Sequence, residues 1–120
     1  MPERVEKLEI WQEGVEIVKA IYTLTTSWPK EELYGLTNQA RRAAVSIPAN
    51  LAEGLGRGTP KEVGRFAQIS LGSLYELDTL LHLAAQFGYS TQDVVVALRE
   101  RITTLAKRIS SFITYQENRQ

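Results

Sequence analysis

The side chains with the greatest capacity for chemistry are eight polar residues in two central segments that are otherwise rich in small and apolar residues. They are Gln39, Arg41, Arg42, Asn50, Glu53, Arg57, Arg65 and Glu76. A guanidinium group binds carboxylates and phosphates through a planar set of donors. The set therefore predicts either arginine–glutamate pairs that hold the fold together or a surface that binds anions such as RNA.

The spacing of these residues leaves both interpretations open. Glu53 lies three residues after Asn50 and four before Arg57, so each pair shares a helix face if a helix persists there. Arg41 and Arg42 point about 100° apart on a helix, so at most one of them lies squarely on the core side. Spacing alone does not decide which arginines are buried.

In the first interpretation, one of the two adjacent arginines forms an ion pair with Glu53 or Glu76, within one chain or between copies, because a buried charge must be paired. In the second, the arginines and the Gly56-Arg57 turn contact phosphate groups. A contiguous basic surface would favour the second interpretation, whereas scattered arginines paired within the fold would favour the first.

The other reactive residue types do not form a known catalytic or metal-binding pattern. His82 is the single histidine and the chain has no cysteine, so we expect His82 to have a structural or surface role. The glycines between positions 54 and 58 follow a predicted helix and lack the Gly-Lys-Ser/Thr end of a phosphate-binding loop. We therefore expect no enzyme activity, no cofactor and no metal.

Composition indicates an ordinary globular protein. Hydrophobic residues make up 43% of the 120 residues and charged residues 23%, and 14 basic side chains balance 14 acidic ones. A typical nucleic-acid-binding protein is more basic. No apolar run approaches the roughly 18 residues of a membrane helix, and the first residues lack the apolar segment of a signal peptide. We expect a cytoplasmic protein without membrane contact.

Charge is nevertheless unevenly distributed along the chain. Residues 1–36 carry four basic and seven acidic side chains, residues 37–65 five and two, and residues 91–120 five and three. Solvated helix faces are one explanation. The other is a basic surface that meets the acidic surface of another copy, or RNA.

Four stretches show the three-four apolar spacing of amphipathic helices, at about residues 8–26, 37–54, 60–87 and 91–116. In the first, two adjacent seams form an apolar face wider than one neighbouring helix would cover. One seam contains Ile10, Gly14, Ile17, Ile21, Leu24 and Trp28, and the other contains Trp11, Val15, Val18, Tyr22 and Thr25. The third stretch is apolar around most of its circumference, which predicts burial on more than one side.

Capping residues and breakers separate these stretches. We expect Thr37 and Thr59 to be N-caps, with Glu62 completing a capping box after Thr59. Pro48 should kink the second helix, which then resumes, because proline removes a backbone hydrogen bond. Gly88 should end the third helix.

The fourth stretch opens with another predicted capping box, Ser90-Thr91-Gln92-Asp93. It continues in a strict apolar stripe that contains Val95, Leu98, Ile102, Leu105, Ile109 and Phe112. Long helices with short connections predict an all-α fold, an antiparallel up-down-up-down four-helix bundle in a single domain over residues 1–120.

The central part of the chain also carries a specific motif. It comprises Tyr34-Gly35-Leu36-Thr37, Gln39, Arg41-Arg42-Ala43-Ala44-Val45-Ser46-Ile47-Pro48, Asn50, Ala52-Glu53-Gly54 and Gly56-Arg57. Trp11-Gln12 and Ile21-Tyr22 precede it, and Phe66, Gly72-Ser73 and Glu76-Leu77 follow it. Over about residues 8–90 this arrangement resembles the bacterial four-helix-bundle family of 23S rRNA intervening-sequence proteins, to which the accessory variability determinant of diversity-generating retroelements looks related.

The resemblance implies a bundle that assembles into a homopentamer, and it implies no catalytic residues. In the retroelement relative, a basic surface serves binding of reverse transcriptase and nucleic acid. Two functions follow as candidates: a homo-oligomeric scaffold or partner-binding module, and an RNA-associated accessory protein that binds rRNA or a reverse transcriptase complex. The wide apolar face of the first stretch separately favours self-association, because large exposed apolar patches usually mark interfaces.

Overall fold

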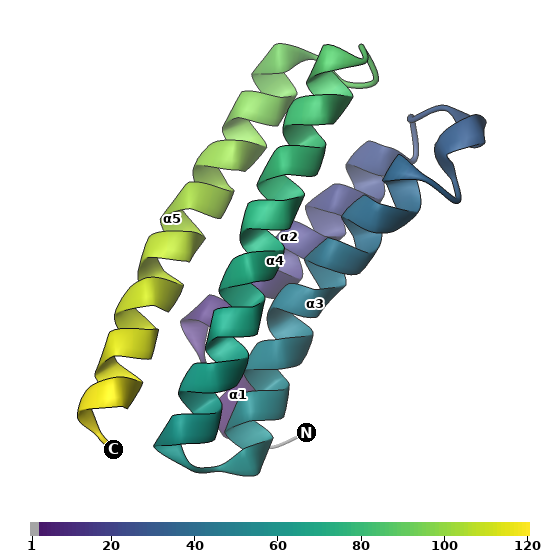
Figure 1. Ribbon diagram of the computed structural model, residues 1–120. Coiled ribbons are helices and arrows are strands. Elements are labelled where there is room, and N and C mark those ends of the chain that lie inside the picture. The colour runs from purple at the N-terminus through teal and green to yellow at the C-terminus, as the bar shows by residue number, and fades with distance from the viewer. Residues whose placement is uncertain (1–2) are drawn as a thin grey trace.

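The computed structural model describes residues 3–120, with side chains from residue 4 onward, and consists of long helices packed side by side (Figure 1). The elements are α1 (Glu3–Glu6), α2 (Glu9–Thr25), the 3-10 turn η1 (Lys30–Glu32), α3 (Leu36–Arg57), α4 (Pro60–Gln86) and α5 (Gln92–Asn118). Successive long helices alternate in direction. The predicted all-α four-helix bundle is confirmed. Within the described residues, no helix has the length and apolar character needed to cross a membrane.

The first apolar seam of α2 faces the core, whereas the second is only partly covered. Ile17 and Gly14 of the first seam are buried. A Cβ atom built on Gly14 would lie 3.5 Å from Pro48 Cδ, so α2 and α3 pack closely there. Tyr22 of the second seam remains 43% exposed. The short helix α1, which the apolar pattern did not predict, adds Val5 to the buried residues.

The helix α3 continues through Pro48 and runs from Leu36 to Arg57, as expected for a helix that resumes after the proline. The proline ring is buried opposite Gly14. We attribute the continuity to this packing, which offsets the backbone hydrogen bond that proline cannot donate.

The N-terminus of α3 is capped by a glutamate from the preceding turn, so the prediction of Thr37 as N-cap is wrong. Thr37 is buried inside the first turn of the helix. The Oε1 atom of Glu32 accepts a hydrogen bond of 3.0 Å from the Leu36 N–H group. A carboxylate four residues upstream can reach this free donor because the chain turns back through Gly35, whose N–H donates to the Glu32 carbonyl at 2.9 Å.

The boundaries of α4 and α5 follow the sequence signals more closely. Thr59 Oγ1 accepts a hydrogen bond of 3.2 Å from the Glu62 N–H group, which confirms the predicted N-cap. The Glu62 carboxylate binds Arg65, so the return bond of a capping box is replaced by an ion pair. Gly88 has a φ of 77° and confirms the predicted helix end. α5 starts directly after Thr91, although the Thr91 side chain makes no capping hydrogen bond.

The four long helices share one apolar core. α4 lies between α3 and α5 and packs against both, as its wide apolar circumference predicted (Figure 1). The largest fully buried side chains of the long helices are Ile17, Ile21, Ile47, Leu74, Leu77, Leu81, Ile102, Leu105 and Ile109.

Candidate interaction surface

One side of the bundle carries a shallow groove that combines aromatic, apolar and arginine side chains. It is formed by α2, the connection through η1 and the first half of α3. The groove is lined by Tyr22, Leu33, Tyr34, Asn38, Arg41, Arg42, Val45 and Ser46, which together define the α2–α3 face. Large apolar side chains are seldom left open in such a cluster, and yet Tyr34 is 90% exposed and Leu33 47%. The α2–α3 face therefore has the composition of a binding surface.

Arg41 is half-buried and is held by α2 without a carboxylate. Its Nε atom donates to Thr25 Oγ1 at 2.9 Å, and its guanidinium carbon lies 4.7 Å from the centre of the Tyr22 ring. The face of an aromatic ring attracts a cation. The Thr25 hydroxyl donates in turn to the Ile21 carbonyl at 2.7 Å. These contacts fix the direction of the arginine but leave its charge uncompensated.

Gln39, Arg42 and Glu76 line a polar notch between α3 and α4, next to the α2–α3 face. All three are exposed. Ser46 and Ser73 also line this notch, where Ser73 Oγ donates to Ser46 Oγ at 2.7 Å. The structure therefore brings these three predicted site residues together as an open polar surface.

Asn50 and Glu53 have local partners on α3. Asn50 Nδ2 donates to the carbonyl and the hydroxyl of Ser46, each at 2.8 Å. Glu53 pairs with Arg57 at 3.8 Å, as their four-residue spacing predicted. Among the described residues, no ion pair joins either of the two adjacent arginines to Glu53 or Glu76, so the predicted pairing is not formed within one chain. Pairing between copies stays a prediction.

Arg57, at the opposite end of α3, and Arg65, near the start of α4, lie around the ring of Phe66. Their guanidinium carbons lie 5.1 and 4.7 Å from the ring centre. Arg57 is paired with Glu53, and Arg65 is paired with Glu62 at 3.0 Å. The eight predicted residues are thus divided among separate places, and these two arginines do not extend the α2–α3 face.

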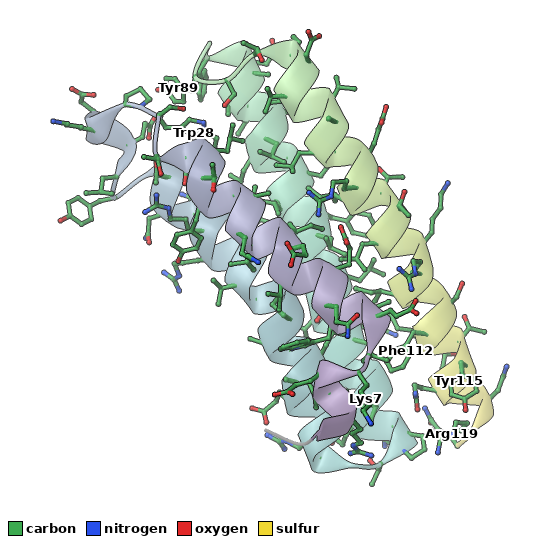
Figure 2. The ribbon with its side chains drawn as sticks, turned by 180° about the vertical axis from the view of Figure 1, so that it is seen from behind. Lys7, Trp28, Tyr89, Phe112, Tyr115 and Arg119 are labelled. Atoms are coloured by element: carbon green, nitrogen blue, oxygen red, sulfur yellow. The ribbon has the colours of Figure 1, made fainter. Side chains whose placement is uncertain are left out.

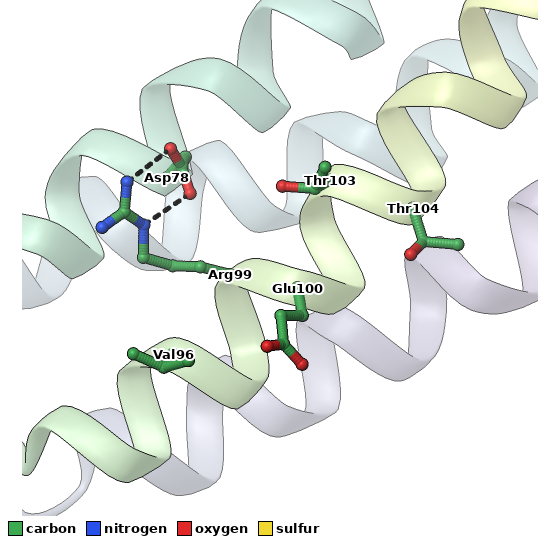
Figure 3. A pocket seen from close by; sticks show the side chains of 6 residues that line it. All are labelled: Asp78, Val96, Arg99, Glu100, Thr103 and Thr104. Carbon is green, nitrogen blue, oxygen red and sulfur yellow. Dashed lines mark hydrogen bonds and ion pairs between the residues drawn. The ribbon is translucent and has the colours of Figure 1, made fainter.

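A charged contact between α4 and α5 involves residues that the sequence analysis did not single out. Arg99 of α5 donates to both carboxylate oxygens of Asp78 of α4, at 2.8 and 3.1 Å (Figure 3). Hydrogen bonding to Asp78 raises the pKa of the Arg99 guanidinium. Such a two-pronged geometry fixes orientation as well as charge.

Two further pairs join α5 to α2. Arg101 pairs with Glu13 at 2.9 Å, and Arg108 pairs with Glu9 at 2.8 Å. The spacing of these residues in the sequence could have predicted the two pairs. The two glutamates are four residues apart and the two arginines seven apart. All four flank apolar seams, as charged pairs do in coiled coils. Because these side chains are partly exposed, each pair contributes under about 1 kcal/mol.

His82 lies on the surface, where its Nδ1 atom is 3.5 Å from Arg99 Nη1. Within residues 3–120, no three side chains of the types that bind metals are grouped as a site. The α2–α3 face is the feature to which we attach a function.

Comparison with known proteins places the chain in a family. No functionally curated protein matches it. A solved structure with the same fold is a protein of unknown function from the S23 ribosomal protein family of Bacteroides thetaiotaomicron, with a TM-score of 0.77 and 20% identity, covering 87% of this chain and 97% of that chain. Residues 6–111 match the family described as 23S rRNA-intervening sequence protein. Since this match takes in most of the chain, the protein belongs to the 23S rRNA-intervening sequence protein family.

Proposed function

We propose that this protein is a non-enzymatic module that associates with copies of itself through the α2–α3 face. The observation that carries the proposal is the juxtaposition of Tyr22, Leu33, Tyr34 and Val45, all more than 40% exposed, with two arginines that form no ion pair with a carboxylate among the described residues. An aromatic and arginine centre is typical of energetically important contact sites.

A second copy of the chain is the partner that the charges favour. Arg41 and Arg42 form no ion pair among the described residues, and Glu76, Asp93 and Glu100 are likewise exposed without one. The net charge of zero also means that copies do not repel each other through a large common charge. An arginine on one copy and a glutamate on the next would make a head-to-tail contact.

Repeated head-to-tail contacts close into a ring when the rotation between copies permits it. Five copies is the number that the resemblance to intervening-sequence and retroelement accessory proteins implies. We adopt a homopentameric scaffold as the proposed assembly, with the α2–α3 face at each contact.

Charge reversal on the face should weaken the assembly. We expect Arg42→Glu to lower the mass measured by light scattering at micromolar concentration, because it places a negative charge where a carboxylate of the next copy must bind. Tyr34→Ala should act in the same direction by removing an exposed anchor. Lys61→Glu is the matched control, since Lys61 is also exposed but lies at the start of α4, away from the face. Equal masses for Arg42→Glu and Lys61→Glu would contradict the proposed contact.

RNA binding is the competing function, and the pairing of the arginines weighs against it. Five arginines have carboxylate partners within the chain: Arg57, Arg65, Arg99, Arg101 and Arg108. Scattered, paired arginines are poor ligands for phosphate groups, and binding to RNA or to a reverse transcriptase complex is therefore the less favoured proposal.

Any RNA binding should be weak and sensitive to salt. It would rest on phosphate contacts from Arg41, Arg42, Arg57, Lys61 and Arg65. When the logarithm of the binding constant is plotted against the logarithm of the salt concentration, each phosphate contact to a single strand contributes about −0.7 to the slope. Five contacts therefore give a slope no steeper than about −3.5. Titration of labelled RNA between low and high salt measures this slope. Nanomolar binding that persists at high salt would reverse the preference between the two functions.

A further inference from the structure

The connection between α2 and α3 is clamped by one glutamate. Glu32 Oε1 accepts from the Leu36 N–H group at 3.0 Å, and Glu32 Oε2 accepts from the Tyr89 hydroxyl at 2.7 Å. The carboxylate thereby closes a five-residue loop from Glu32 to Leu36. Leu33 and Tyr34 lie at the tip of this loop, and they are two of the exposed apolar residues of the α2–α3 face.

Tyr89 comes from a distant part of the chain, the connection between α4 and α5. Its position is set by Gly88, whose φ of 77° lets the Tyr89 N–H donate back to the Ala84 carbonyl at 2.9 Å. The ring lies 6.2 Å from that of Trp28, and the Trp28 Nε1 atom donates to Ser90 Oγ at 2.8 Å. Figure 2 shows Trp28 and Tyr89 next to each other at one end of the bundle.

We infer that the Tyr89–Glu32 hydrogen bond is a latch by which the α4–α5 connection positions Leu33 and Tyr34 for binding. The inference rests on the proposed function for its consequence, but the latch itself is independent of it. Tyr89 does not line the α2–α3 face, so it acts through Glu32 as a positioning residue. Without the latch, the Leu36 amide and the backbone hydrogen bond from Gly35 to the Glu32 carbonyl still hold the loop, but its tie to the α4–α5 connection is lost and the exposed apolar pair is held less firmly.

The neighbouring groups determine the charge state of the Glu32 carboxylate in the latch. Tyr89 faces Glu32 from the α4–α5 connection. Lys30 and Glu31 lie on the same segment as Glu32, and the nearby Trp28 side chain is an uncharged indole. Hydrogen bonds from Leu36 and then Tyr89 lower the pKa of Glu32, and the same contact raises the pKa of Tyr89. A lowered carboxylate pKa means that the latch is complete above the ordinary value of 4.5 and is lost as pH falls through the folded-state value.

Two variants open the latch while leaving the core intact. Tyr89→Phe keeps the ring and removes the hydroxyl donor. Gly35→Ala acts from the other side, because a Cβ atom there would lie 2.6 Å from Glu32 Oε1 and displace the flexible carboxylate. Tyr115→Phe is the control, since Tyr115 is exposed and its hydroxyl has no hydrogen bond among the described residues. Glu32→Gln keeps the shape of the side chain without its charge.

Amide hydrogen exchange tests the latch directly. We expect residues 33–36 to exchange about threefold to tenfold faster in Tyr89→Phe and Gly35→Ala than in the parent, with no change in Tyr115→Phe. Assembly measured by light scattering should weaken in the same two variants. It should also weaken in the parent as the pH falls through the lowered pKa of Glu32, with a smaller pH response in Glu32→Gln.

The outcomes separate the latch from the proposed function. Unchanged exchange in both latch variants would overturn the latch. Faster exchange without weaker assembly would overturn its role in positioning the face. If the parent is monomeric, the proposed function fails, and the exchange rates alone decide whether the latch exists.

Discussion

Leu105→Ala should lower the free energy of unfolding by about 2–5 kcal/mol. Leu105 has no exposed surface and belongs to the core cluster shared by all four long helices. Truncation removes apolar contacts and leaves a cavity, and the cost depends on how far the neighbours collapse into it. The measurement is urea unfolding followed by circular dichroism at a fixed protein concentration, because self-association would make stability depend on concentration.

The neighbouring position supplies the control for this experiment. Thr104 is exposed on the same turn of α5, so Thr104→Ala should change the free energy of unfolding by no more than about 0.5 kcal/mol. If Leu105→Ala is as stable as the parent, the assignment of the α5 stripe to the core is wrong.

Gly54→Ala should destabilise the protein by up to about 2 kcal/mol, although alanine is the better helix former. A Cβ atom at Gly54 would lie 2.9 Å from Phe66 Cβ and 3.2 Å from both Cα and the carbonyl oxygen of Val63. Two of these neighbours are backbone atoms of α4, which cannot turn aside. Overpacking costs about 1–3 kcal/mol and outweighs the roughly 1 kcal/mol of helix propensity that alanine gains over glycine.

The same substitution at Gly72 should have the opposite sign. Gly72 lies in the interior of α4, and a Cβ atom there would meet nothing within 4 Å. Gly72→Ala should therefore stabilise the chain by about 0.5–1 kcal/mol. Unfolding curves of the two variants give the comparison. A stabilising Gly54→Ala would show that α3 and α4 are further apart than described here.

Much of the fold could be predicted from the sequence because its signals are local. The apolar spacing of the long helices is set by 3.6 residues per turn, and Thr59 and Gly88 cap α4 through groups within a few residues of the helix ends. The N-terminus of α3 was misassigned because its cap comes from Glu32, beyond the three-residue reach of the usual N-cap pattern. The continuity at Pro48 depends on Gly14, a contact between two helices.

The contacts of the site were less predictable, because they join residues that are far apart in the sequence. Periodicity indicates that Arg41 and Arg42 point in different directions, but their partners depend on how neighbouring helices are rotated. That Arg41 stacks on Tyr22, and that Glu53 is already occupied by Arg57, follows only from the packed structure. The hydrogen bond between Tyr89 and Glu32, two residues before the exposed Tyr34, joins positions 57 residues apart in the sequence.

Membership of the 23S rRNA-intervening sequence protein family and the four-helix bundle are established, whereas the role as an assembly module is our proposal. A family relationship between this chain and the retroelement accessory protein is part of our proposal. Its reverse transcriptase and nucleic-acid partners would need a basic surface, whereas five arginines here are paired with carboxylates.

The most direct test of the central proposal is the mass of the parent protein in solution, measured by sedimentation equilibrium at micromolar concentration. Self-association predicts a multiple of 13.5 kDa, and the proposed pentamer predicts about 68 kDa, five times that mass. A dimer or tetramer would retain the α2–α3 face as an interface and replace the number five. A single species of 13.5 kDa would contradict self-association outright.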